Sequence, residues 1–106
     1  MPKFLVQASY TKEGVAGVMG KGGTARRDAV EHMAGELGGR LESFHFGFGE
    51  HDAHVIVDLP DNEAAAAVAM TVGASGAAAT RIIVLLTPEQ VDEAARRSVN
   101  YRAPGS

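Results

Sequence analysis

The chain has no cysteine among its 106 residues, which excludes a disulfide framework, thiolate metal sites and a cysteine nucleophile. No apolar run approaches the ~18 residues that a membrane span needs, and no signal-peptide pattern opens the chain. Acids and bases are interspersed with a net charge of −3, so no basic stripe favours nucleic acid. We therefore expect a soluble, cytoplasmic protein that binds neither membranes nor nucleic acid.

The length is enough for one domain and too small for two. Such a chain buries roughly two thirds of its extended surface, which gives a modest core. We expect one domain over residues 1–100 and a tail over residues 101–106. The composition, rich in alanine and glycine, is typical of bacteria with GC-rich genomes.

The first half of the chain predicts a strand followed by helices. Residues 3–10 alternate, with Phe4 and Val6 among the side chains that face the core. Thr11 can cap a short helical piece in a glycine-rich region. A stronger helix follows from Thr24 and ends at Gly38-Gly39, and its apolar stripe consists of Val30, Met33, Ala34 and Leu37.

The second half predicts a hairpin over residues 41–59, a helix, a strand over residues 77–86 and a last helix. Asp61 is the expected N-cap of the first of these helices, whose small residues allow close packing on a sheet. Thr87-Pro88-Glu89-Gln90 predicts a capping box at the start of the last helix. We expect Val91, Ala94 and Ala95 of that helix to face inward.

The hairpin concentrates the polar chemistry of the chain. A type II′ turn at Gly49-Glu50 would place His45 opposite His54 and Gly47 opposite Asp52. One face would then be apolar, and the other would carry a His/His/Asp cluster. A three-residue turn would instead put the two histidines on different faces.

The order β-α-β-β-α-β predicts an α+β, ferredoxin-like fold with a four-stranded antiparallel sheet and an added C-terminal helix. Helices cover only one face of such a sheet. The other face is too apolar for water and too polar for a core, with Leu5, Leu41, Ile56 and half of the last strand beside Lys3, Gln7, Ser9, Ser43, His45, Asp52 and His54. A homodimer, sheet against sheet, would resolve this and leave a part-polar cavity between the subunits. The expected ligand-binding residues are Gln7, Ser9, Ser43, His45, Asp52 and His54.

His45, His54 and Asp52 are also the candidate catalytic residues. Two imidazoles and a carboxylate suit acid–base work near neutral pH, a metal ion or an axial haem ligand. No HExxH or similar spacing is present, so we expect no metal and no cofactor, with haem or a metal at His45 or His54 as an alternative. Inert, hydrogen-bonded filling of a dimer cavity is the competing interpretation.

Three basic residues suggest a weaker site for an anion. Lys21, Arg26 and Arg27 lie around the predicted start of a helix, where an anionic ligand can be held. The segment Gly20-Lys21-Gly22-Gly23-Thr24 lacks the spacing of a phosphate loop. A flexible loop with solvated arginines is the alternative, and His32 is expected on a solvated helix face.

Several motifs resemble the GYD-domain family. They are Tyr10-Thr11-Lys12-Glu13-Gly14, Gly38-Gly39, Phe48-Gly49-Glu50-His51-Asp52, the run from Val55 to Asp61 and the tail from Tyr101 to Gly105. The resemblance implies a dimeric α/β barrel, in agreement with the fold above. The family usually has tyrosine where this chain has His51, so a role that needs a phenol does not carry over to that position.

The family is largely without an assigned activity, so the resemblance implies fold more than function. Related barrel groups include cofactor-independent monooxygenases, haem-handling enzymes, isomerases and binding or stress proteins. Two classes of function follow. The favoured one is a homo-oligomeric small-molecule-binding or stress-associated protein, and the alternative is a barrel-type monooxygenase or isomerase that uses His45, His54 and Asp52. Haem binding is a third.

Overall fold

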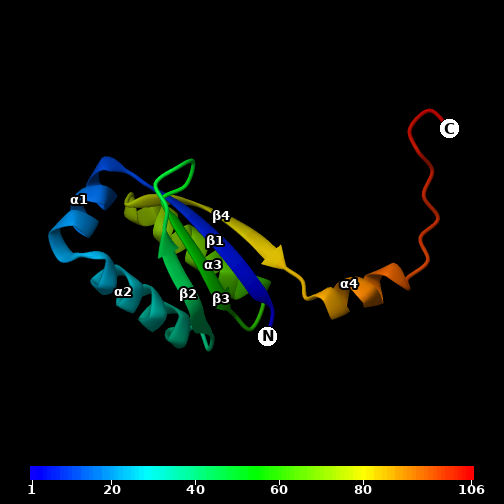
Figure 1. Ribbon diagram of the computed structural model, residues 1–106, viewed down its shortest axis with the longest axis horizontal. Coiled ribbons are helices and arrows are strands. Elements are labelled where there is room, and N and C mark those ends of the chain that lie inside the picture. The colour runs from blue at the N-terminus through cyan, green and yellow to red at the C-terminus, as the bar shows by residue number, and fades with distance from the viewer.

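A four-stranded antiparallel sheet organises the chain. The computed structural model describes residues 1–106, and its strands are β1 (Lys3–Tyr10), β2 (Arg40–Phe46), β3 (Ala53–Asp58) and β4 (Ala78–Leu85). They lie in the order β2-β3-β1-β4, with every neighbouring pair antiparallel (Figure 1). This is the ferredoxin-like βαββαβ arrangement, with two helices in the first crossover, so the predicted fold class is confirmed.

Four helices complete the chain: α1 (Lys12–Lys21), α2 (Gly23–Glu36), α3 (Asn62–Ser75) and α4 (Pro88–Ala95). The three predicted caps are confirmed. Thr11 accepts a hydrogen bond from the Gly14 amide, and Asp61 accepts one from the Ala64 amide at 2.8 Å. Thr87 and Gln90 form the reciprocal capping box at the start of α4. No helix has the length and apolar character that crossing a membrane requires.

The core lies between one face of the sheet and helices α2 and α3. Strand alternation turns Phe4, Val6, Val55 and Val57 to this side, where each is at most 8% exposed. The small residues of α3 let it pack close to the strands, as the sequence predicts. The core cluster consists of Phe4, Val6, Ala34, Val55, Val57, Leu59, Ala64, Ala65 and Val68, with the predicted α2 residues Val30, Met33 and Leu37 at its border.

A β-bulge corrects one predicted position. Leu41 pairs with Val57 but Ser43 pairs with Ile56, so Glu42 is the extra residue in β2. The bulge turns Leu41 toward the core, where it packs against the buried cluster. The prediction that Leu41 lies on the uncovered face was therefore wrong, because strict alternation does not hold through position 42.

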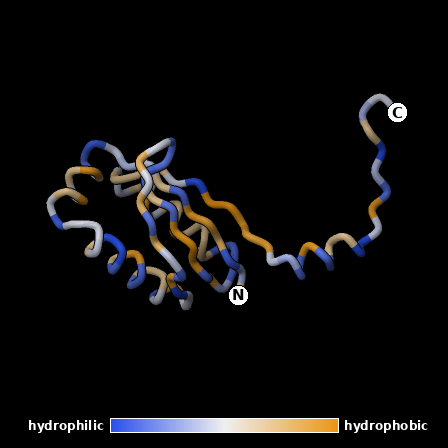
Figure 2. The backbone as a smooth tube through the Cα atoms, in the orientation of Figure 1, coloured by the Kyte–Doolittle hydropathy of each residue, from blue (hydrophilic) through white to orange (hydrophobic).

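The opposite face of the sheet carries no helix. α2 and α3 both pack on the core side, and in Figure 1 α3 passes behind the strands. Figure 2 shows that apolar character continues along β4, which is an edge strand of the sheet. Ile83 of β4 lies on this face and is 37% exposed, whereas Val84, opposite Phe4, lies on the helix side and is still 54% exposed. The protomer thus leaves one sheet face and one apolar strand uncovered.

The last helix differs from the prediction. α4 extends away from the sheet together with the C-terminal tail, which gives the molecule its longest dimension of 55 Å (Figure 1). All its residues are exposed, and Val91 is 51% exposed. The expectation that Val91, Ala94 and Ala95 face inward was therefore wrong. Local capping signals place the start of a helix but say nothing about where it docks.

Candidate functional site

The predicted histidine pair is confirmed by the strand register. His45 of β2 lies directly opposite His54 of β3, and Gln7 of β1 lies opposite His54 on its other side. The Gln7 side-chain nitrogen is 3.5 Å from Nδ1 of His54, at the outer limit of a hydrogen bond. Arg81 of β4 continues the same row beyond Gln7. A polar row therefore crosses the uncovered face on all four strands.

The turn that sets this register is not the predicted one. β2 ends at Phe46 and β3 begins at Ala53, so the connection is longer than two residues. Gly49 does not have the positive φ that a type II′ turn requires at its first position. The register survives because the Gly47 amide donates to the Asp52 carbonyl at 2.9 Å and so pairs these two residues as predicted.

Asp52 has a structural partner close to the histidine row. Its carboxylate accepts a hydrogen bond from the Tyr10 amide at 2.9 Å, and its own amide donates to the Ala8 carbonyl. No hydrogen bond joins Asp52 to His45 or His54. The carboxylate therefore holds the end of β1 against the hairpin loop, which is the turn-stabilising role that is common for aspartate.

His51 contributes to the site in a way that the sequence did not indicate. His51 is half-buried, and its Nδ1 lies 3.1 Å from Oγ of Ser9. Ser9 also donates to the Glu50 carbonyl at 3.4 Å. The uncovered face thus carries a third imidazole at its loop end, next to the predicted ligand residue Ser9.

An apolar row lies next to the polar row. Ile56 of β3 faces Leu5 of β1, and Leu5 faces Ile83 of β4. Ser43, opposite Ile56, ends this row on β2. The predicted ligand residues are all on strands or at strand ends of one face, but none of them lines one of the four main cavities of a single protomer. These residues are Gln7, Ser9, Ser43, His45, Asp52 and His54.

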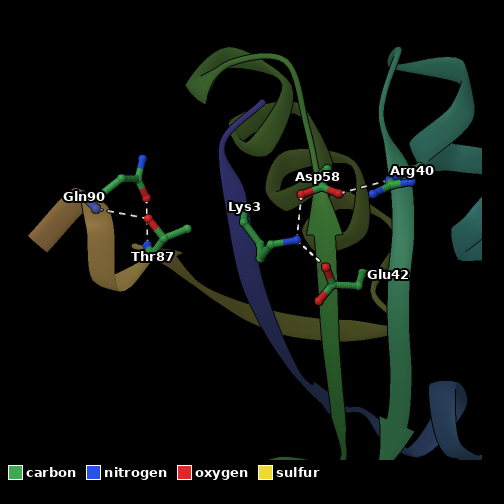
Figure 3. A network of polar contacts seen from close by, with 6 residues as sticks. All are labelled: Lys3, Arg40, Glu42, Asp58, Thr87 and Gln90. Atoms are coloured by element: carbon green, nitrogen blue, oxygen red, sulfur yellow. Dashed lines mark hydrogen bonds and ion pairs between the residues drawn. The ribbon is translucent and has the colours of Figure 1, made fainter.

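A network of charged side chains lies on the same face, at the end of the sheet away from the hairpin loop (Figure 3). Asp58 accepts from Lys3 at 2.9 Å and from Arg40 at 3.2 Å, and Lys3 also pairs with Glu42. The hydrogen bond from Lys3, helped by the one from Arg40, lowers the pKa of Asp58 against a smaller opposing effect of burial. Hydrogen bonds to Glu42 and Asp58 raise the pKa of Lys3. The β-bulge at Glu42 contributes to this network, because it directs the Glu42 side chain toward Lys3.

The three predicted anion-binding residues do not stay together. Lys21 and Arg26 border one cleft between α1 and α2, whereas Arg27 points elsewhere and pairs with Asp28 at 3.3 Å. His32 is exposed and pairs with Glu36 at 3.2 Å, as expected for a solvated helix face. No group of three or more histidine and acidic side chains is placed to hold a metal ion.

Comparison with known proteins identifies the family. A family model described as the GYD domain matches residues 4–95, from the second residue of β1 to the last residue of α4. No curated protein and no solved structure gives a significant match. The matched range includes β2, β3, β4, the hairpin loop and all of β1 except its first residue. The chain therefore belongs to the GYD domain family.

Proposed function

We propose that the protein is a homodimer that binds a small organic molecule between two sheets packed face to face, in a binding or stress-associated role. The observation that carries this proposal is the uncovered face, with an apolar row beside a polar row. A single subunit leaves both rows in water, which is unfavourable for contiguous apolar side chains. A two-fold axis that lies in the interface between two such sheets would pack this face of one subunit against the same face of the other.

The two rows have different roles in this proposal. The apolar residues Leu5, Ile56 and Ile83 supply contact area, at about 25 cal/mol per Å² removed from water. The polar residues of the neighbouring row keep hydrogen-bonding groups that a partner sheet cannot all satisfy. Such groups at the centre of a largely apolar interface are typical of a site that orients a small ligand.

The chemistry of the polar residues favours a planar, hydrogen-bonding ligand. The imidazoles of His45 and His54 can stack on a flat ring and can donate or accept hydrogen bonds near neutral pH. Gln7, Ser9 and Ser43 add neutral donors and acceptors on the same face. Asp52 is engaged by the Tyr10 amide and would border the site rather than act in it.

A barrel-type enzyme is the second candidate function, either a cofactor-independent monooxygenase or an isomerase. The observation that favours it is the direct pairing of His45 with His54, with the Gln7 amide beside His54. Two adjacent imidazoles can share acid and base roles in proton transfer. Haem held by one of these imidazoles is a less favoured third candidate, and a Soret band in the purified protein would reveal it.

Native mass spectrometry of the freshly purified protein tests the binding role. We expect a dimer that carries a small molecule, and we expect His54→Ala or His45→Ala to reduce its retention. His32→Ala is the matched control, because His32 is exposed on α2 and pairs only with Glu36. A dimer that carries the same molecule after both sheet-face substitutions would contradict a site at these residues.

A further inference from the structure

A second candidate site lies on the helix side, away from the uncovered sheet face. It is a cleft of about 390 Å³, within the range of small-molecule sites, between α1, α2, the end of β1 and the start of β4. The amide and hydroxyl of Thr11 donate to the Ala77 and Gly76 carbonyls, which ties the start of α1 to the turn before β4. Gly14 permits this contact, because a Cβ there would lie 2.0 Å from the Ala77 carbonyl oxygen.

The cleft holds two basic side chains without acidic partners. Neither Lys21 nor Arg26 forms a salt bridge, although five of the other lysines and arginines do (Lys3, Arg27, Arg40, Arg96 and Arg97). Nε of Arg26 is buried and has no hydrogen-bond partner. A buried donor left unpaired is costly, so this atom marks a place where an acceptor is missing.

The charge of the cleft favours an anion with a single charge. Lys21 and Arg26 contribute two positive charges, and Glu13 on the wall contributes one negative charge without pairing with either. The first turn of α2 also borders the cleft and has no side-chain cap, so its free amides can donate to an anion, whereas the last turn of α1 presents the negative end of its dipole to the same cleft. The guanidinium fork of Arg26 matches the geometry of a carboxylate.

An apolar chamber adjoins the cleft. Tyr10 and Arg26 line both spaces, and the other chamber walls are the core side of the sheet and the inner faces of α2 and α3. The chamber measures about 40 Å³, enough for about one water molecule or a methyl group. Tyr10 therefore lies at the junction of the two spaces, and its hydroxyl makes no hydrogen bond within the chain.

We propose that the cleft binds a small organic monocarboxylate, with its carboxylate at Arg26 and Lys21 and its apolar part toward the chamber. The polar end meets the unpaired basic groups of Arg26 and Lys21. The apolar end meets Val18, Ala25 and Ala29 on the cleft wall. This site does not depend on a dimer or on the histidines, so it is independent of the sheet-face proposal.

The test is a titration of the full ¹⁵N-labelled chain with hexanoate, followed by amide NMR shifts, with hexanol as the uncharged probe. We expect saturable shifts for hexanoate at the amides of residues 21–26 and of Tyr10, and weaker binding of hexanol. Arg26→Gln should weaken hexanoate binding about tenfold, since it removes a charge-assisted hydrogen bond. Arg27→Gln is the matched control, because Arg27 does not line the cleft, and we expect less than about a twofold change.

Two glycines of α1 give an independent pair of variants that does not alter charge. Gly17 lines the cleft and Gly20 does not, and a Cβ at either position would meet no atom within 4 Å. Gly17→Leu should fill the cleft and abolish the hexanoate shifts, whereas Gly20→Leu should leave them unchanged. The proposal is overturned if hexanoate gives no saturable shifts at the cleft, if hexanol binds as tightly, or if either control variant loses as much binding as its cleft counterpart.

Discussion

Single residues decide how the uncovered face is held in place. Asp58 is the only buried charged residue, with 7% exposure, and it binds Lys3 of β1 and Arg40 of β2 from its position on β3. It therefore ties three strands together at one end of the face (Figure 3). Two cationic partners stabilise the ionised form of this carboxyl group relative to its protonated form.

The stability that Asp58 contributes should depend on pH in one direction. Its pKa in the folded chain lies below the ordinary value of 3.8, so its contribution is fully present above about pH 4 and is lost as the pH falls through the folded pKa. We expect Asp58→Asn to lower the free energy of unfolding by about 1–2 kcal/mol at neutral pH. Urea unfolding at a series of pH values should show the difference from wild type shrinking below pH 4.

Asp28→Asn is the control for this experiment, because Asp28 is exposed on α2 and pairs only with its neighbour Arg27. It should change the free energy of unfolding by less than about 0.5 kcal/mol. A difference between wild type and Asp58→Asn that grows toward acid pH would contradict the ion-pair role of Asp58.

Two glycines near the end of α2 should respond in opposite ways to alanine. A Cβ on Gly39 would lie 2.1 Å from the Asp58 carbonyl oxygen, whereas a Cβ on Gly35 would meet no atom within 4 Å. We expect Gly39→Ala to destabilise the fold by about 2–3 kcal/mol through overpacking. Gly35→Ala should be neutral or stabilising by up to about 1 kcal/mol, because alanine is the better helix former. Thermal and urea unfolding of the two variants would measure the contrast, and equal effects would contradict the close approach at Gly39.

At the scale of elements, two capped helices differ in what they pack against. Asp61 caps α3, which contributes three buried residues to the core, whereas Thr87 caps α4, which buries none. Asp61→Ala should therefore lower the global free energy of unfolding by about 1 kcal/mol. Thr87→Ala should reduce amide protection only within residues 88–95 and leave global unfolding unchanged. Hydrogen exchange read residue by residue separates these outcomes, and an equal global loss from both substitutions would contradict the exposed position of α4.

Elements with local signals could be predicted from the sequence. Alternation gave the strand faces, and Asp61 and Thr87 marked helix starts. The pairing of His45 with His54 was predicted from a two-residue turn at Gly49-Glu50, and the register is right although that turn is not the one present. The bulge at Glu42 had no such signal, since one extra residue in a strand depends on how β2 twists against β3. Its consequence was large, because it moved Leu41 to the core and brought Glu42 to Lys3.

The parts of the site that were not predicted depend on contacts between distant segments. His51 meets Ser9, and Arg81 joins the histidine row, only because β1 lies between β3 and β4. Likewise, the cleft at Lys21 and Arg26 forms where α1 is tied to the turn at Ala77. The sequence indicated the basic residues but not the separation of Arg27 from the other two.

At the scale of the whole molecule, the two proposed sites lie on opposite sides of the sheet. The cleft at Arg26 belongs to one protomer and is complete within it. The sheet face has residues suited to a ligand but does not enclose a site. A second copy packed on this face would enclose it. Association is therefore the central claim, because the proposed role of the histidine row depends on it.

Sedimentation equilibrium at micromolar protein concentration tests this claim most directly. We predict that the wild-type chain sediments at twice its 11.0 kDa mass. Ile56→Glu, which places a charge in the apolar row of the sheet face, should sediment as a single folded subunit. Met19→Glu, at a position 82% exposed on α1, should remain dimeric. A wild-type chain that stays at 11.0 kDa under these conditions would contradict the paired sheets and the cavity between them.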